Sequence, residues 1–145
     1  MIMDLTTLFS NAQPITATAV STNIIDLGNT GTPYGATQLR RDIGKGMSIP
    51  LVLNVVQTFN NLTSLTISIQ KATDVAFTTP LTVFQSPAYA LADLAIGARY
   101  LLPDAIPVGT DLRYIRLNYT VAGTAPTLGQ ITAGVVMGGQ DSFVG

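Results

Sequence analysis

The feature that most constrains this chain is an alternation of apolar and polar side chains, clearest over residues 113–121. A period of two places successive side chains on opposite faces of an extended strand, whereas a helix repeats its apolar positions every three or four residues. This strand therefore has one face suited to a hydrophobic core and one face suited to water. The core face carries Ile115, Leu117, Tyr119 and Val121, and the opposite face carries Tyr114, Arg116, Asn118 and Thr120.

Two further segments alternate in the same way, at residues 65–69 and at residues 131–137. An apolar run over residues 49–56 precedes the first of them, and Asn60 and Asn61 lie between the two. Because Asn tolerates the positive φ of a tight turn, we predict a β-hairpin formed by residues 49–56 and 65–69. Weaker strand patterns bring the total to about eight short strands, and they occupy residues 16–20, 23–27, 81–85 and 99–102.

The spacing of these strands predicts an all-β domain. Helical composition is mild and confined to residues 88–98. About eight short antiparallel strands in 145 residues are typical of a β-sandwich or jelly roll, with a small closed barrel as the alternative. We expect a single domain over residues 1–145, interrupted by one long polar loop at residues 28–47.

The composition excludes most catalytic chemistry, because the chain contains no His, Cys, Trp or Glu. Without His or Cys it cannot form a Ser-His-Asp triad, a thiol nucleophile, or the His and Cys ligand sets that zinc prefers. We therefore expect no catalytic residues, no metal and no cofactor. The remaining enzymatic alternative is a hydrolase that would pair Asp104 with Asp111 across a loop.

Charged residues make up only 10% of the chain, and seven Lys and Arg against eight Asp leave a net charge of -1. A typical soluble domain is about 25% charged. The balance predicts neither a nucleic-acid partner nor an anionic membrane partner, and the absence of a signal-like or membrane-spanning segment predicts synthesis in the cytoplasm. Low charge favours a subunit that buries much of its surface in an assembly, and exposed edge strands offer one means.

Two groups of side chains are candidates for such an interface. Arg40, Arg41 and Lys45 lie close together in the polar loop and would suit an acidic protein surface, with a solvated loop rim as the alternative. Tyr114 and Arg116 share the outward face of the strand at residues 113–121 and have the composition of interface anchors. An ordinary wet sheet face is the alternative for this second group.

Several segments, taken in order, resemble a known family. They are residues 16–28 (TATAVSTNIIDLG), 31–35 (GTPYG), 41–46 (RDIGKG), 113–124 and 131–136. Together they are similar to the capsid cement, or decoration, proteins of tailed bacteriophages, of the kind found on a short-tailed Bordetella phage. The likeness extends over about residues 1–140 and depends on the order of the segments rather than on one motif.

This resemblance implies a jelly-roll subunit, dimeric or trimeric, that sits on the outer surface of the virion capsid and clamps adjacent major capsid proteins. It implies no catalysis, and it carries over no catalytic or metal residue. The five interface candidates would then contact the capsid or a second subunit. The competing interpretation is a carbohydrate- or receptor-binding jelly-roll module of a phage tail or fibre, which would use exposed Tyr and loop Asp side chains.

Overall fold

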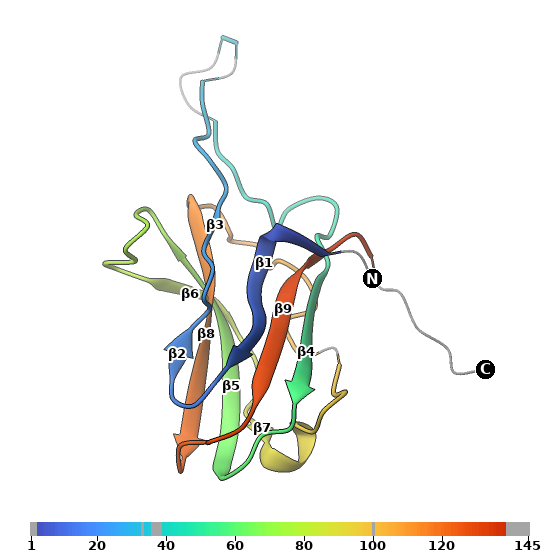
Figure 1. Ribbon diagram of the computed structural model, residues 1–145. Helices are drawn as coiled ribbons and strands as arrows, with labels where there is room; N and C mark the ends of the chain where they lie inside the picture. The colour runs from blue at the N-terminus through green and yellow to red at the C-terminus, as the bar shows by residue number, and fades with distance from the viewer. Residues whose placement is uncertain (1–2, 33, 36–38, 100, 139–145) are drawn as a thin grey trace, which may run out of the picture.

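A computed structural model describes residues 3–32, 34–35, 39–99 and 101–138, which form nine strands and one turn of 3₁₀ helix (Figure 1). The longer strands are β1 (Met3–Pro14), β4 (Leu51–Gln57), β5 (Leu62–Ala72), β6 (Leu81–Gln85), β8 (Tyr114–Gly123) and β9 (Gln130–Val136). The two-residue strands are β2 (Ala19–Val20), β3 (Ile25–Asp26) and β7 (Tyr89–Ala90), and the helix η1 covers Leu91–Asp93.

The strands form two antiparallel sheets that pack face to face (Figure 1). A three-stranded sheet has the order β1-β9-β4. A six-stranded sheet has the order β2-β8-β5-β6, with β3 also paired to β8 and β7 also paired to β5. The predicted all-β sandwich of the jelly-roll kind is confirmed. The single helix among the described residues is far too short to cross a membrane.

The predicted hairpin between residues 49–56 and 65–69 is wrong, because β4 and β5 belong to different sheets. β4 pairs with β9, whereas β5 pairs with β8, β6 and β7. Asn61 does adopt a positive φ of 64°, but the buried Phe59 donates its backbone N–H to the Leu94 carbonyl at 3.1 Å, and the chain crosses between the sheets there. Burial of the two apolar strands on opposite sides of one core overrides the local turn signal.

The weaker strand predictions have mixed outcomes. β6 coincides with residues 81–85, while residues 16–20 and 23–27 contribute only the two-residue strands β2 and β3. The described part of residues 99–102 is not a strand, although the Leu101 N–H donates to the carbonyl of Leu53 in β4 at 3.4 Å.

Helix and loop content also follow from local composition. Only η1 forms within the mildly helical stretch at residues 88–98. The described part of residues 28–47 contains no strand, as predicted for the long polar loop.

The sequence pattern missed β1, because this strand does not alternate regularly. Its pairing with β9 shifts register three times, between Met3 and Leu8, between Leu8 and Ser10, and between Ser10 and Gln13. Ala12 also adopts a positive φ of 46°. Each irregularity changes which face the following side chains occupy, so no period of two survives in the sequence.

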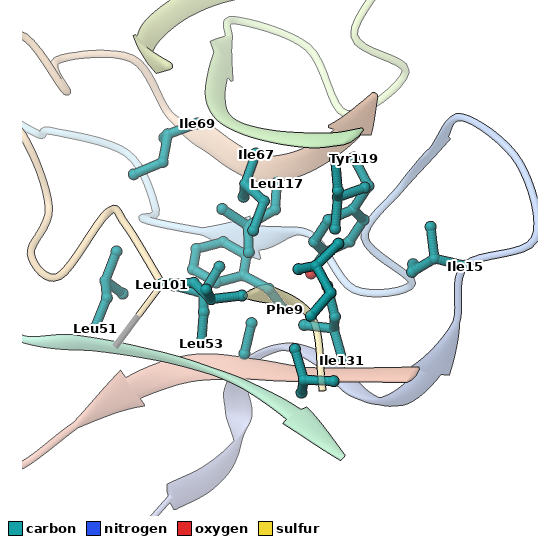
Figure 2. Close-up of a cluster of buried hydrophobic side chains, with 14 of the residues drawn as sticks. Phe9, Ile15, Leu51, Leu53, Ile67, Ile69, Leu101, Leu117, Tyr119 and Ile131 are labelled. Atoms are coloured by element: carbon teal, nitrogen blue, oxygen red, sulfur yellow. The ribbon is translucent and has the colours of Figure 1, made fainter. Parts of the chain in front are cut away.

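The core lies between the sheets, where Phe9, Leu53 and Ile131 of one sheet meet Leu117 and Tyr119 of the other (Figure 2). All five side chains are buried, and the predicted core face of β8 is confirmed. The Tyr119 hydroxyl lies 2.7 Å from Ser10 Oγ, and Ser10 Oγ in turn donates to Gln13 Oε1 at 2.7 Å. Because the Ser10 proton is used in the second bond, Tyr119 donates in the first. This hydrogen-bonded chain joins β8 to β1 across the core.

Candidate functional site

Three long connections meet at one end of the sandwich, which we call the arm end. The ends of β3 and β5 lie beside the start of β8, since both Asp26 and Ala72 pair with Tyr114. The start of β4 is joined there to the segment before β8 by the bridge between Pro50 and Ala105. The arm end is thus built by residues 27–50, 73–80 and 103–113, and loops gathered at one end of a sandwich are a common place for binding sites.

Part of the first connection runs away from the body of the sandwich, as the upper loop in Figure 1 shows. We call residues 28–41 the arm, of which Pro33 and residues 36–38 lie outside the described residues. Tyr34 on the arm is fully exposed. Gly31 and Gly35 have positive φ values of 65° and 76°, which glycine adopts without the steric cost that a Cβ would add.

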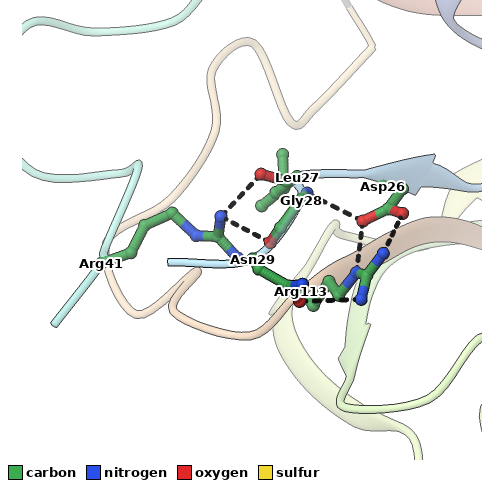
Figure 3. A network of polar contacts seen from close by, with 6 residues as sticks. All are labelled: Asp26, Leu27, Gly28, Asn29, Arg41 and Arg113. Atoms are coloured by element: carbon green, nitrogen blue, oxygen red, sulfur yellow. Dashed lines mark hydrogen bonds and ion pairs between the residues drawn. The ribbon is translucent and has the colours of Figure 1, made fainter. Parts of the chain in front are cut away.

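The base of the arm is the point where the chain leaves the sandwich at residues 26–29 and returns at Arg41. Arg113 holds the leaving side of this base. Its guanidinium grips Asp26 with two parallel bonds, Nε to Oδ1 at 2.7 Å and Nη2 to Oδ2 at 2.8 Å (Figure 3). Nη1 donates to Asn29 Oδ1 at 2.8 Å, and the guanidinium carbon lies 5.0 Å from the centre of the Tyr114 ring. Hydrogen bonds from Arg113 and from the Gly28 N–H lower the pKa of Asp26 to about 2. The pair therefore stays ionised in all but strong acid.

The returning side of the arm base is held by Arg41, one of the predicted interface residues. Its Nη1 donates to the carbonyls of Leu27 and Gly28 at 2.6 and 3.0 Å, which closes the arm across its base (Figure 3). Its Nε is buried and has no partner among the described residues. The structure therefore separates Arg41 from its predicted companions, because Arg40 and Lys45 are exposed while Arg41 is directed into the arm base.

The turn that follows the arm is fixed to the segment before β8. Asp42 accepts the Gly109 N–H at 2.9 Å and the Gly44 N–H at 3.0 Å, one on each carboxylate oxygen. A Cβ at Gly44 would lie 2.0 Å from the Pro107 carbonyl oxygen, so only glycine permits this approach. Lys45 lies in this turn, and its backbone N–H donates to the Asp42 carbonyl at 3.2 Å.

The two carboxylates that could have formed a hydrolytic pair have separate environments. Asp111 is paired with Lys71 at 2.5 Å, and this cation lowers the pKa of Asp111. Lys71 also donates to the Gly109 carbonyl at 2.7 Å. Asp104 is exposed, and its backbone carbonyl accepts the Leu51 N–H at 2.7 Å. Within the described part of the chain, no three acidic side chains gather as a metal site would require.

Tyr114 and Arg116 lie on the outer face of the six-stranded sheet, as the alternation predicted. Arg116 is already engaged, because its Nε donates to Gln70 Oε1 at 2.9 Å and its guanidinium carbon stacks 4.1 Å from the centre of the buried Phe77 ring. Burial lowers the pKa of Arg116. The Tyr114 ring is covered by Arg113, so neither side chain projects freely.

Sequence reasoning missed the apolar side chains of the arm end. Met47, Val75 and Val108 are exposed by 91%, 59% and 63%, and they lie in the three connections that meet there. In the sequence, each of them is a single large apolar residue within a polar stretch rich in turn-forming residues, and this is the pattern that could have identified them. Singly exposed apolar residues are ordinary, whereas several at one end of a molecule point to an interface.

A polar hollow of about 420 Å³ lies between the arm base and the segment before β8. Asn29, Thr30, Arg41, Thr73 and Asp111 contribute its polar walls. These side chains offer both hydrogen-bond donors and hydrogen-bond acceptors, so the hollow could bind a small polar group of a ligand or partner.

The fold and this surface define a class of protein: an all-β sandwich with an arm held at its base and with exposed apolar side chains in the connections at one end. The family model Bbp16 matches residues 9–135, and the chain belongs to the Bbp16 family. The family's name suggests a bacteriophage protein, of a Bordetella phage in particular. A search of the curated proteins found no match.

Proposed function

We propose that this chain is a structural virion protein that binds the outer surface of a phage head and clamps neighbouring major capsid proteins. Such a cement protein performs no catalysis and needs no cofactor, metal, nucleic acid or membrane. In this proposal it is made in the host cytoplasm and attaches to the capsid as a dimer or trimer. Membership of the Bbp16 family supports the phage origin, and the role on the head is our inference.

The observation that carries the proposal is the arm end. An arm held from both sides by Arg41 and Arg113 presents the fully exposed Tyr34, and exposed apolar side chains lie in the connections of the same end. Because these contacts fix residues 26–29 and Arg41 before binding, the base of the arm loses less conformational entropy when a partner is bound. A protein that binds the joint between assembled capsid subunits more tightly than the free subunits stabilises the assembled head by mass action.

Two cations of the arm and of the turn after it, Arg40 and Lys45, support an acidic partner group. No carboxylate of the described residues lies within ion-pairing distance of Arg40 or Lys45, while Asp26 and Asp111 are neutralised by Arg113 and Lys71. Arg40 and Lys45 are thus free of ion pairs within the described residues, as are the carboxylates Asp42, Asp74 and Asp104 of the same end, so only a partner carboxylate that reaches Arg40 or Lys45 directly would be attracted. Opposite charge on the capsid surface would raise the rate and the specificity of attachment.

Co-sedimentation of the purified protein with expanded phage heads that lack it tests the proposal, together with its mass by light scattering. We expect saturable binding. Arg40→Ser should weaken attachment about threefold to tenfold at low salt, which corresponds to about 1 kcal/mol. The matched control Arg99→Ser removes the same charge beside the other end of β4 and should leave binding unchanged.

Arg41 is omitted from this test, because its replacement would also release the arm base. Unchanged attachment of the Arg40→Ser variant would remove Arg40 from the interface, and unchanged attachment of Tyr34→Ala as well would remove the described part of the arm. Absence of saturable binding by the unmodified protein would refute the cement role.

The second candidate is a carbohydrate- or receptor-binding module of a phage tail or fibre, and the polar hollow favours it. The hollow presents an amide, a hydroxyl, a guanidinium and a carboxylate at Asn29, Thr30, Arg41 and Asp111. Saturable binding of a glycan that is lost in Asn29→Ala, without binding to heads, would support this candidate over the first.

A further inference from the structure

The outer edges of the three-stranded sheet are both covered by the chain itself. Along β4, the Val55 N–H donates to the Ala98 carbonyl at 2.9 Å, and the Gly97 N–H donates to the Val55 carbonyl at 3.0 Å. At the start of β4, the Leu51 N–H donates to the Asp104 carbonyl at 2.7 Å. The segment before β8 therefore occupies this edge, and no extended chain could pair with β4 without displacing it.

The β1 edge is covered by the segment between β2 and β3. The Asn23 backbone N–H donates to the Phe9 carbonyl at 3.0 Å, and its side-chain amide donates to the Leu8 carbonyl at 2.7 Å. Near the start of β1, the Asp4 carboxylate accepts the Thr6 N–H at 2.7 Å, so a local turn bends this part of the strand. Bends and covering loops are two ways in which natural sheets block unwanted strand pairing.

The β6 edge of the six-stranded sheet lacks such cover. One side of β6 pairs with β5, whereas the N–H and C=O groups on its other side have no partner among the described residues. The five residues Leu81–Gln85 contain no charge and no Pro, and Leu81, Thr82 and Gln85 are exposed. Its one irregularity is a bulge with an extra residue at Val83, whereas β1 shifts register three times and is also covered by a loop.

We propose that β6 is the edge through which this protein associates with a second copy of itself. In this pairing β6 of each copy runs antiparallel to β6 of the other about a twofold axis, so that the two six-stranded sheets become continuous. The proposed function includes self-association, and this inference names the strand that would mediate it. It rests on the proposed function. It adds the strand and the register through which two copies would pair.

A second copy fits this edge because the strand is compatible with itself. A twofold axis at Val83 places Val83 opposite its own copy, Thr82 opposite Phe84 and Leu81 opposite Gln85. None of these positions carries a charge, so no like charges face each other. The nearest cation, Lys71, pairs with Leu81 across the sheet and is neutralised by Asp111. An acidic capsid partner is instead matched by the positive charge of the arm.

The absence of cysteine from the chain allows a direct test by single-cysteine cross-linking. Directly opposed Cα atoms in an antiparallel pair lie about 4.5–5.5 Å apart, within the range that a disulfide spans. Val83→Cys should therefore give a covalent dimer on mild oxidation, with weaker cross-linking from Thr82→Cys. The control Thr124→Cys lies just beyond the far end of β8, where the side chain is exposed, and should remain a monomer on a denaturing gel.

A charge at the edge tests the same pairing without a covalent bond. Thr82→Lys should weaken the dimer at least tenfold by light scattering, and mixing it with Thr82→Asp should restore the dimeric mass. Thr124→Lys is the matched control and should leave the mass unchanged. A monomeric or trimeric unmodified protein, or an intact Thr82→Lys dimer, would overturn the inference.

Head binding separates the two proposals. Saturable binding to heads by a monomeric protein would refute the β6 dimer and keep the cement function. If Thr82→Lys remains a dimer but no longer binds heads, the β6 dimer is also refuted, and β6 pairs with a strand of the capsid instead. A Thr82-sensitive dimer that does not bind heads would support the β6 pairing and refute the cement function.

Discussion

Replacing Tyr119 by Phe tests the hydrogen-bonded chain that joins the two sheets. The Tyr119 side chain is completely buried, and its hydroxyl donates to Ser10 Oγ at 2.7 Å. Ser10 is itself 1% exposed and donates to Gln13 Oε1, which also accepts the Thr22 N–H at 2.9 Å. Phe fills nearly the same volume as Tyr, so the substitution removes one hydrogen bond and leaves the packing unchanged.

The magnitudes follow from which groups lose their partners. A buried hydrogen bond contributes about 1 kcal/mol net, and a chain of this size loses about 3 °C of Tm per kcal/mol. We therefore expect Tyr119→Phe to lower the free energy of unfolding by about 1 kcal/mol. Ser10→Ala removes both of its bonds and leaves the phenol buried without a partner, so about 2–3 kcal/mol is expected. The double variant should cost about 1 kcal/mol less than the sum of the single variants.

Urea unfolding followed by circular dichroism measures these differences. All variants should be compared at one protein concentration, because self-association raises apparent stability. Tyr114→Phe is the matched control, since the Tyr114 hydroxyl has no partner among the described residues, and its effect should stay within about 0.5 kcal/mol. Additive costs in the double variant, or equal effects of the two Tyr→Phe changes, would refute the bond between the sheets.

Three further predictions concern the arm end and the pH dependence of stability. Gly44→Ala should cost about 3 kcal/mol in urea unfolding, because its Cβ would meet the rigid Pro107 carbonyl; an effect below about 1 kcal/mol would contradict the contact. Because the pKa of Asp26 is lowered, its pairing with Arg113 stabilises the fold above pH 3.8, and this contribution is lost as the pH falls towards about 2. Asp26→Asn should therefore flatten the loss of stability over that pH range. Burial raises the pKa of Tyr119, so the unfolded chain releases this proton first and stability should fall above about pH 10; an equal slope in Tyr119→Phe would show that another group is responsible.

The fold class was predictable because strand character is a local property. The alternation in β8 identified its core face residue by residue, and the position of β6 was correct. The long polar loop was also recognised from its composition. β1 could not be found in this way, because its register shifts remove the period of two, and they arise from pairing with β9 more than 100 residues later.

The candidate site was predictable only in part. The sequence placed Arg40, Arg41 and Lys45 together in one loop, but their neighbouring positions could not reveal that the Arg41 guanidinium turns back onto the carbonyls of Leu27 and Gly28. This contact depends on the path of the chain between Gly28 and Arg41, which brings Arg41 back beside Leu27 and Gly28. The exposed apolar residues of the arm end were missed for the same reason, since they come from connections that only the sandwich brings together.

By itself, the sequence determined the all-β class, the inward face of β8, the position of the polar loop and the low charge that favours assembly. The tertiary structure decided that β4 pairs with β9 and not with β5, that Arg41 and Arg113 hold the arm, and that β6 keeps an open edge. The physical reason is one of range. A period of two is set by each residue's own backbone geometry, whereas strand partners and bonds across loops are chosen by burial of the whole chain around one core.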